Sequence, residues 1–331
     1  MTTALDILQP PPPVIDARAL RKAFGQQVAV DDLSFTVPAG TILGLLGPNG
    51  AGKTTTIKML TTLLPIDGGS ARVAGCDVAA EPHEVRRSIG LAGQSAAVDD
   101  KLTARQNLDL FGRLYHLPGP RRRERVEGLI ERFGMTEYAD RPTETLSGGE
   151  RRRLDLVAAL IADPPAIFLD EPTTGLDPRG RQALWEQIRA IRDGGAAVVL
   201  TTQYLEEADQ LADSIVVIDR GSIVASGTTA ELKARLERDV LEIRLAHSGQ
   251  TAAAAAAIDA EGVLVVDERT LHLPVTDTPG SLTALRRVEA AGVEVADFQL
   301  RRPTMDDVFI ELTGQPARPN DETHGTTEER A

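Results

Sequence analysis

The sequence predicts an α/β fold built on a mostly parallel sheet, followed by a second, smaller α+β domain. Two observations lead to this prediction. From about Val14 to Arg238, short apolar runs alternate with longer helical patterns, which is typical of a parallel sheet covered by helices. After Arg238 the expected order becomes strand, helix, two strands, helix and strand, which is the ferredoxin-like arrangement.

Apolar, β-branched composition marks the strands of the large domain. The clearest are "TILGLLG", "AIFLDE", "AAVVLTT" and "SIVVIDRG". The first three end in polar residues, and open α/β sheets bind ligands at the carboxyl ends of their strands. Between the first two of these strands, a helical pattern over about 95–165 predicts a helical subdomain.

The elements of the small domain follow one another closely. We expect strands at "VLEIRLA" and "VEVADFQL", a hairpin at "GVLVVDERTLHLPV", and helices at "QTAAAAAAIDAE" and "SLTALRRVEAAG". A last short helix, "TMDDVFIEL", closes this domain.

The two ends of the chain differ from both domains. Residues 1–13 close in a run of four prolines, and residues 314–331 are polar without a periodic apolar face. Segments that cannot bury apolar surface stay disordered. We therefore expect disorder over 1–13 and 314–331, a large domain over 14–238 and a small domain over 239–313.

The composition excludes several classes of protein. A formal charge of −13 argues against a duplex-binding protein, because nonspecific affinity for nucleic acid comes from Lys and Arg side chains that neutralise phosphates. Cys76 is the only cysteine, which excludes a disulfide framework or a cysteine zinc cluster and suits a reducing cytoplasm. No apolar run reaches the roughly 18 to 20 residues of a membrane helix. If the protein acts at a membrane, we expect another chain to span it.

A phosphate-binding loop follows the first strand. The stretch "GPNGAGKTT" lies between "TILGLL" and the helical "TTIKMLTTLL", the context that the pattern G-x-x-x-x-G-K-[ST] requires. Backbone N–H groups of the loop surround phosphate oxygens, Lys53 reaches the β- and γ-phosphates, and Thr54 ligates Mg²⁺. The alternative is a glycine-rich turn without a ligand. The motif predicts that the large domain is a P-loop NTPase that binds nucleotide phosphates through Gly47, Pro48, Asn49, Gly50, Ala51, Gly52, Lys53, Thr54 and Thr55.

Two carboxylates end the strand "AIFLDEP". A buried parallel strand admits ionised residues only at its end, where they face a ligand or a cation. Asp170 is expected to hold Mg²⁺, directly or through water, and Glu171 to take a proton from an attacking water. The alternative is a strand that runs into a solvated turn with helix-capping acids.

A second anion site is predicted at the start of "LSGGERRRLDLVAAL". Ser147 is a plausible N-cap, and Gly148 and Gly149 leave the backbone N–H groups of the helix start accessible. The alternative is an ordinary helix cap. The residues by themselves do not say whether this site and the P-loop face the same phosphate.

The P-loop, "LSGGE", "FLDEP" and the following "GLDP", in this order, resemble the nucleotide-binding subunit of ATP-binding-cassette (ABC) transporters over about 15–230. The resemblance implies a head-to-tail homodimer in which the Ser147 loop faces the γ-phosphate held by the partner's P-loop. It implies that Gln94 in "LAGQS" touches Mg²⁺ and the attacking water, and that Asp177 links the two sites across the dimer. It also implies that Phe24 stacks on adenine, for which a core phenylalanine is the alternative.

Gln203, in "LTTQYLEEADQLAD", departs from the family. Most members carry a histidine there that contacts the γ-phosphate. A glutamine amide can donate the same neutral hydrogen bond to a phosphate oxygen, but it can neither become a cation nor exchange a proton. Two outcomes are open: slower, pH-insensitive hydrolysis, or a site that depends wholly on Glu171. The alternative is an amide that caps the following helix.

Three stretches together are similar to the ATPase subunits of daunorubicin/doxorubicin resistance exporters: "LTTQYLEEADQLAD", "LSGGERRRLDLVAAL" and "RRPTMDDVFIELTG". The resemblance implies an ATPase at the cytoplasmic face of the membrane, peripheral to a separate multi-pass subunit of the ABC-2 type. It would power export of drugs, antibiotics or other hydrophobic metabolites, although no residue here contacts the cargo.

The alternative function is a soluble ABC ATPase that acts on ribosomes or DNA. Members that act on ribosomes usually carry two cassettes in one chain, whereas this chain has one P-loop and one "LSGGE". Members that act on DNA ends insert long coiled coils between the two motifs. The interval from Lys53 to Ser147 holds only the usual helical subdomain. The exporter ATPase is therefore the preferred function.

Overall fold

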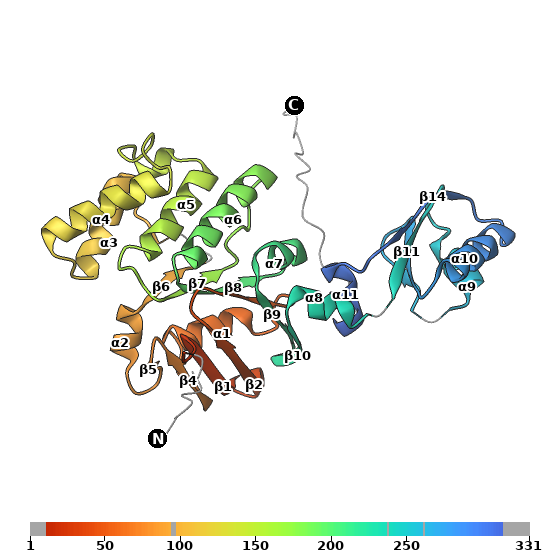
Figure 1. Cartoon of the computed structure of the whole chain (residues 1–331), viewed down its shortest axis with the longest axis horizontal. Helices are drawn as coiled ribbons and strands as arrows, with labels where there is room; N and C mark the ends of the chain where they lie inside the picture. The colour runs from red at the N-terminus through yellow and green to blue at the C-terminus, as the bar shows by residue number, and fades with distance from the viewer. Residues whose placement is uncertain (1–10, 94–96, 237, 261, 314–331) are drawn as a thin grey trace, which may run out of the picture. The chain divides into compact units, whose positions relative to one another are not determined.

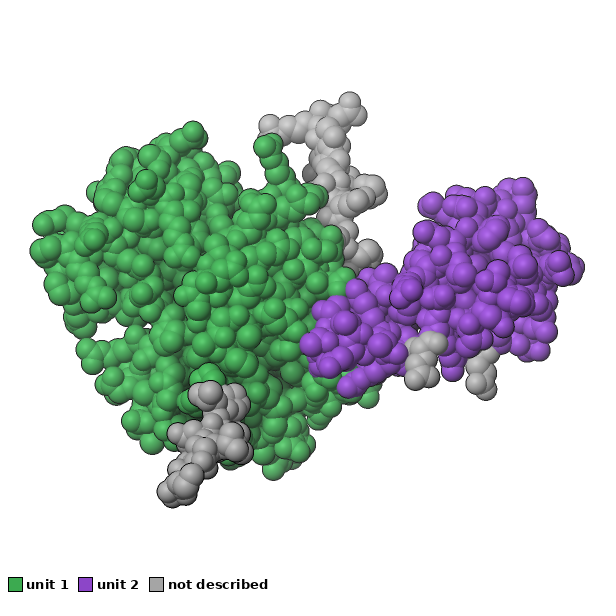
Figure 2. All heavy atoms as spheres, in the orientation of Figure 1, with its two compact units in different colours: residues 1–226 green, residues 227–331 purple. Residues whose placement is uncertain are grey.

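The computed structural model describes residues 11–93, 97–236, 238–260 and 262–313. It divides into two compact units, Met1–Ser226 and Gly227–Ala331 (Figure 2). The division falls ahead of the boundary expected near Arg238, because helix α8 (Thr229–Ala234) packs against α11 (Met305–Thr313) of the second unit. No helix in the described ranges combines the length and the apolar character needed to cross a membrane.

A six-stranded sheet forms the centre of the first unit, in the order β10-β9-β3-β8-β7-β6. The pairs β6–β7, β7–β8, β8–β3 and β3–β9 are parallel, as expected. The four strands predicted from the sequence correspond to β3, β7, β8 and β9. The bounds of the sheet strands are β3 Ile42–Leu46, β6 Ile89–Ala92, β7 Ala166–Asp170, β8 Ala197–Thr202, β9 Ser214–Asp219 and β10 Ser222–Gly227.

Both faces of this sheet are covered (Figure 1). Along β7, Ile167 and Leu169 join a core cluster with the helices α3, α4, α5 and α6, whereas Ala166 and Phe168 join a second cluster with β1, β2, β4 and α1. Burial on both faces explains why these strands are apolar throughout instead of alternating. The helices span α1 Lys53–Leu60, α2 Pro82–Arg87, α3 Ala104–Leu114, α4 Gly119–Arg132, α5 Gly148–Ala159, α6 Pro178–Asp193 and α7 Leu205–Leu211, with a 3₁₀ turn at Thr143–Thr145.

A second, antiparallel sheet is formed by strands from both sides of the P-loop in the sequence, and it was not predicted. Its order is β2-β1-β4-β5, and it places its apolar face over α1. Gly25, at φ 61°, lies in the tight turn between its first two strands. The strands are β1 Ile15–Phe24, β2 Gln27–Val37, β4 Gly68–Val73 and β5 Cys76–Asp77.

The second unit contains the predicted ferredoxin-like arrangement. Its sheet has the order β12-β13-β11-β14, and all three pairings are antiparallel. Helices α9 and α10 cover one face and complete a separate core around Leu241, Ile243 and Val288. The bounds are β11 Asp239–Leu245, α9 Thr251–Ile258, β12 Leu264–Val265, β13 Thr270–Val275, α10 Thr278–Ala290 and β14 Val295–Arg301.

Candidate nucleotide site

Three predicted motifs lie at the carboxyl ends of neighbouring strands of the central sheet. Strand β3 leads into the P-loop, β7 ends at Asp170, and β8 ends at Thr202, just before Gln203. These strands are neighbours in the order β3-β8-β7, and their parallel register pairs Leu46 with Thr202 and Asp170 with Thr201. The P-loop, the carboxylates and Gln203 therefore lie together at the carboxyl ends of these three strands.

Close backbone approach requires glycine at two positions of the P-loop. A Cβ on Gly47 would lie 2.2 Å from the carbonyl oxygen of Ile218. Gly52, at φ 108°, would bring a Cβ within 2.5 Å of the carbonyl oxygen of Ala29 on β2. A side chain at Gly47 or Gly52 would force the backbone to move. The glycines are therefore required by the close packing of the P-loop, which favours this motif over an ordinary glycine-rich turn.

Lys53 begins α1, and its ammonium group lies over the loop. Its Nζ donates to the carbonyl oxygens of Gly47 at 2.7 Å and Pro48 at 3.1 Å. Burial lowers the pKa of Lys53, while the nearby carboxylates of Glu171 and Asp170 favour its charged form. The ammonium group and both carboxylates therefore belong to one electrostatic cluster at the end of the sheet.

Asp170 is buried and accepts hydrogen bonds from two threonine hydroxyls. Thr54 Oγ1 donates to its Oδ1 at 3.1 Å, and Thr201 Oγ1 donates to the same oxygen. Side-chain oxygens are the ligands that Mg²⁺ prefers, and it is usually held by one or two carboxylates together with substrate phosphates. The described residues contain no group of three or more His, Cys, Asp or Glu side chains that could hold a metal without the substrate. The Thr54–Asp170 pair fits such a shared site.

Glu171 adopts a left-handed backbone conformation, with φ at 50°. Its N–H donates to Thr201, to the carbonyl oxygen at 3.1 Å and to Oγ1 at 3.0 Å, and Thr174 Oγ1 donates to its carboxylate at 3.4 Å. For a residue with a side chain this conformation costs about 1–2 kcal/mol. Strain of this kind persists where surrounding contacts hold it, and functional sites are common locations.

Ser147 is the N-cap of α5, as predicted. Its hydroxyl accepts a hydrogen bond from the N–H of Glu150, and the Glu150 carboxylate accepts from the N–H of Ser147, which completes a capping box. Ser147 and Gly148 remain exposed. The capping role and exposure to a second chain are therefore compatible.

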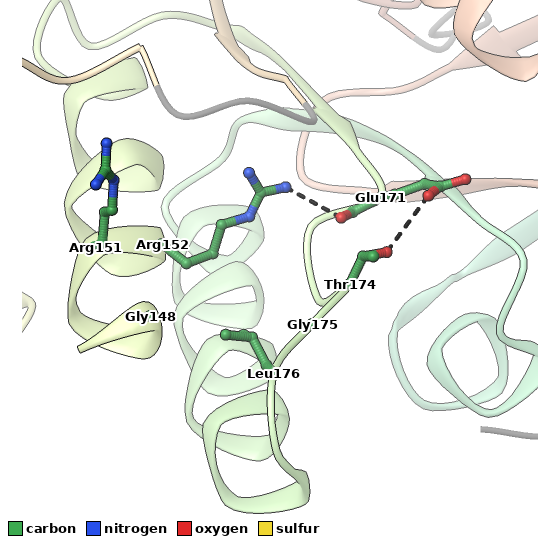
Figure 3. Close-up of a pocket in the computed structure, with 7 residues that line it drawn as sticks. All are labelled: Gly148, Arg151, Arg152, Glu171, Thr174, Gly175 and Leu176. Atoms are coloured by element: carbon green, nitrogen blue, oxygen red, sulfur yellow. Dashed lines mark hydrogen bonds between the residues drawn. The ribbon is translucent and has the colours of Figure 1, made fainter. Parts of the chain in front are cut away.

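A cavity of about 350 Å³ joins the start of α5 to the turn after β7 (Figure 3). Glu171 and Thr174 lie on one side of it, and Arg151 and Arg152 on the other. The start of α5 and the predicted catalytic carboxylate of Glu171 thus share a cavity within one chain.

The structure resolves two of the open alternatives. Phe24 is 50% exposed at the end of β1, with the Lys22 ammonium 5.7 Å from its ring centroid, so it is not a core phenylalanine. Helix α7 has Tyr204 as its N-cap and no side-chain cap, and the N–H of Tyr204 donates to Thr202 Oγ1 at 2.9 Å. The capping alternative for Gln203 is therefore not supported.

The structure describes one of the two remaining predicted residues, Asp177, whereas the other, Gln94, lies outside the described residues. Asp177 is the N-cap of α6, where its Oδ1 accepts a hydrogen bond from the N–H of Gly180 at 2.7 Å. Its expected role across a dimer stays a prediction.

Three residues at the site were missed in the sequence: Arg152, Asp155 and Thr201. Arg152 donates to several backbone carbonyls around Glu171, and Asp155 is its buried neighbour. A signal was present, because an Arg–Asp pair spaced three residues apart interrupts the apolar side of a helix. Thr201 gave no signal beyond its place at the end of a strand.

Comparison with known proteins identifies the family of this chain. Residues 30–174 match the family model "ABC transporter", and residues 227–313 match "ATP-binding protein DrrA1-3-like, C-terminal domain". The daunorubicin resistance ATP-binding protein DrrA3 of Streptomyces coeruleorubidus is 50% identical over 299 residues, which cover 90% of this chain and 95% of that protein. The chain belongs to the ATP-binding proteins of ABC transporters.

Other relatives and solved structures fit the same family. The daunorubicin/doxorubicin resistance ATP-binding protein DrrA of Streptomyces peucetius is 47% identical over 324 residues, covering 97% of this chain and 98% of that protein. The Nod factor export ATP-binding protein I of Ralstonia nicotianae is 37% identical, covering 92% and 95%. A solved ATP-binding subunit of an ABC transporter superposes with a TM-score of 0.61 and 28% identity, covering 67% of this chain and 92% of that one.

Family membership confirms the P-loop NTPase fold and the prediction of an ATPase subunit that powers an exporter. The alternative of a soluble ABC ATPase that acts on ribosomes or DNA is not supported. ATP is accordingly the nucleotide of this site.

Proposed function

We propose that two copies of this ABC ATPase pair head to tail, so that the Ser147 loop of each completes the ATP site of the other. The observation that carries the proposal is the exposed start of α5, where Ser147, Gly148 and a helix amino terminus can receive an anion. A second chain can reach Ser147 and Gly148 because both residues are exposed in the single chain.

Hydrolysis in this site is the attack of water on the γ-phosphoryl group. Glu171 takes the proton of the water, and Lys53 with the P-loop N–H groups offsets the charge that develops on the phosphate oxygens. The Gln203 amide donates a neutral hydrogen bond to the γ-phosphate, and Phe24 stacks on adenine. Asp177 links the two sites, and Gln94 orients the water.

Thr54 and Asp170 would hold Mg²⁺, as their paired oxygens suggest. When bound, the cation neutralises charge on the β- and γ-phosphates. Lys53 remains the chain's own cation at the same phosphates.

We further propose that the ATPase works peripherally at the cytoplasmic face of the membrane with a separate multi-pass subunit of the ABC-2 type. The names of the relatives support export of a drug, an antibiotic or another hydrophobic metabolite.

Affinity purification tests the partnership. The Glu171→Gln chain, stabilised with Mg-ATP, would be purified from detergent-solubilised cells of its native host and analysed by mass spectrometry, with Lys53→Ala as the nucleotide-free control. A stoichiometric multi-pass membrane protein with Glu171→Gln supports the proposal. Ribosomes, DNA-repair factors or a dimer without any membrane protein would contradict it.

A further inference from the structure

Arg152 holds the backbone of the turn that carries Glu171. Its NH2 group donates to the carbonyl oxygen of Glu171 at 3.1 Å (Figure 3). The NH2 group also donates to the carbonyl oxygen of Asp170 at 3.3 Å, and Nε donates to that of Pro172 at 2.7 Å. The guanidinium group is planar and presents its donors in a fixed geometry, so it restrains three consecutive peptide groups at once.

The same side chain also reaches the end of strand β6. Its NH1 group donates to the carbonyl oxygen of Gly93 at 2.6 Å and lies 3.5 Å from Oδ2 of Asp155. Asp155, one turn further along α5, accepts a hydrogen bond from the N–H of Ala97 at 2.8 Å through Oδ1. The Arg152–Asp155 pair therefore ties α5 to two separate stretches of backbone.

This ion pair is unusually buried. The side chain of Asp155 is 2% exposed and that of Arg152 is 11% exposed. Burial lowers the pKa of Arg152 and raises the pKa of Asp155, and the attraction between the two charges opposes both effects. A buried ion pair is often no more stabilising than apolar residues of similar size, so stability alone does not explain its presence.

The turn itself needs external restraint. Glu171 is held at a positive φ, and its N–H is bound on one side by Thr201. Its carbonyl oxygen on the other side is bound by Arg152. A change at Arg152 frees one side of the strained peptide, and the Glu171 carboxylate then loses its fixed direction.

We propose that Arg152 and Asp155 are positioning residues for ATP hydrolysis: they fix the Glu171 turn against the end of β6. We assign them a positioning role because Arg152 donates to backbone carbonyls around Glu171 and pairs with Asp155. The proposal rests on the role of Glu171 as the base.

The first test compares Arg152→Gln and Arg152→Lys with the same changes at Arg132. Arg132 is a matched control because its NH2 group also donates to a distant backbone carbonyl, that of Ala190 at 2.9 Å, outside the site. We expect Arg152→Gln to lower kcat by roughly 10- to 100-fold with KM for ATP changed by less than about 2-fold, since small misplacements of a catalytic group have effects of that order. Arg152→Lys keeps the positive charge but not the planar set of donors, so its kcat should lie between those of Arg152→Gln and the wild type.

Hydrolysis and ATP binding are measured on the full chains, together with the melting temperature of each. If Arg152→Gln fails to fold, the comparison can still be made with Arg152→Lys. If the Arg152 variants match the Arg132 variants in kcat, or if they raise KM at unchanged kcat, the positioning role is wrong.

The second test is a double-mutant cycle with Glu171→Gln. Because Arg152 acts through Glu171, Arg152→Gln should lower the residual rate of the Glu171→Gln chain by less than about 2-fold. A reduction equal to that in the wild-type background would show an independent structural effect and overturn the inference. Full turnover by the Glu171→Gln chain would instead exclude Glu171 as the base, and the positioning inference, which rests on that role, would fall with it.

Discussion

Thr54 donates a hydrogen bond of 3.1 Å to Oδ1 of Asp170, a residue 116 positions further along the chain. The contact joins the first turn of α1 to the end of β7, two elements that only the sheet brings together. It places a hydroxyl and a carboxylate side by side where the P-loop would hold the phosphates of ATP.

Asp170→Asn should therefore weaken the binding of a divalent cation with ATP and slow hydrolysis by roughly 10²-fold. Mn²⁺ titration followed by electron paramagnetic resonance, in the presence of ATP, measures the first effect. Asp109→Asn is the control, because Asp109 pairs with Arg113 and Arg122 on helices α3 and α4. Equal Mn²⁺ affinity in Asp170→Asn and wild type would show that Asp170 does not hold the cation.

Gln203→Ala should slow hydrolysis, whereas Gln203→His should leave it intact or faster. The amide donates one neutral hydrogen bond that alanine lacks and that histidine can replace. Because histidine titrates near neutral pH, only the histidine variant should gain a pH-dependent step between about pH 6 and 7. The rate is measured from pH 5.5 to 9 for all three chains. An alanine variant with the wild-type rate and profile would exclude a catalytic role for Gln203.

Glu207→Gln should stabilise the first unit at alkaline pH. Glu207 is fully buried on α7, where Trp185 Nε1 donates to its Oε1 at 3.3 Å, and burial raises the pKa of this carboxyl. Ionisation then costs more in the folded state than in the unfolded chain, so wild-type stability falls as the pH rises above the unfolded value of about 4.3. Glutamine keeps an acceptor and removes that cost.

Thermal unfolding followed by Trp185 fluorescence measures this effect, and a gain of about 1 kcal/mol corresponds to about 2–4 °C. The gain should be present at pH 8 and vanish near pH 4. Glu186→Gln, an exposed neighbour of Trp185, is the control. A lower melting temperature for Glu207→Gln at pH 8 would contradict the prediction.

Asp307→Asn should destabilise the second unit. Burial alone would raise the pKa of Asp307. Hydrogen bonds from His272, Arg301 and Thr304 outweigh burial and hold this pKa well below its ordinary value. A depressed folded pKa stabilises the protein above the unfolded value of about 3.9, and that contribution is lost as the pH falls toward the folded value. The asparagine variant should therefore cost about 2 kcal/mol at pH 7 and progressively less below pH 4.

Hydrogen exchange of the β11 and β13 amides in the full chain reports on this unit specifically, since its described part contains no tryptophan. Glu289→Gln on α10 is the control, because Glu289 is exposed. Exchange rates at pH 7 that match the wild type would show that the Asp307 cluster contributes nothing to stability.

Much of the fold follows from local sequence pattern. Strands β3, β7 and β8 are continuous apolar runs, and β7 and β8 end in polar residues. The capping box at Ser147 is visible from its spacing to Glu150. The antiparallel sheet of β1, β2, β4 and β5 was missed because its strands are amphipathic and irregular. Register shifts interrupt the pairing of β1 with β2.

The site could be predicted only where one motif is contiguous. The P-loop and the Asp170–Glu171 pair are such motifs. The contacts of Arg152 with Gly93, Glu171 and Pro172 depend on how α5 packs against two strands, and no local pattern encodes that packing. The sequence therefore predicts which groups do the chemistry more readily than which groups hold them in place.

Mixing two inactive chains tests the composite site most directly. Lys53→Ala removes the P-loop cation, and Ser147→Arg fills the exposed start of α5, so each chain alone should lose hydrolysis. In a head-to-tail dimer of the two variants, one site combines an intact P-loop with an intact Ser147 loop, and an equimolar mixture should recover up to about a quarter of the wild-type rate. Recovery supports an ATP site shared between two chains. No recovery, with mixed dimers verified by mass spectrometry, would contradict it.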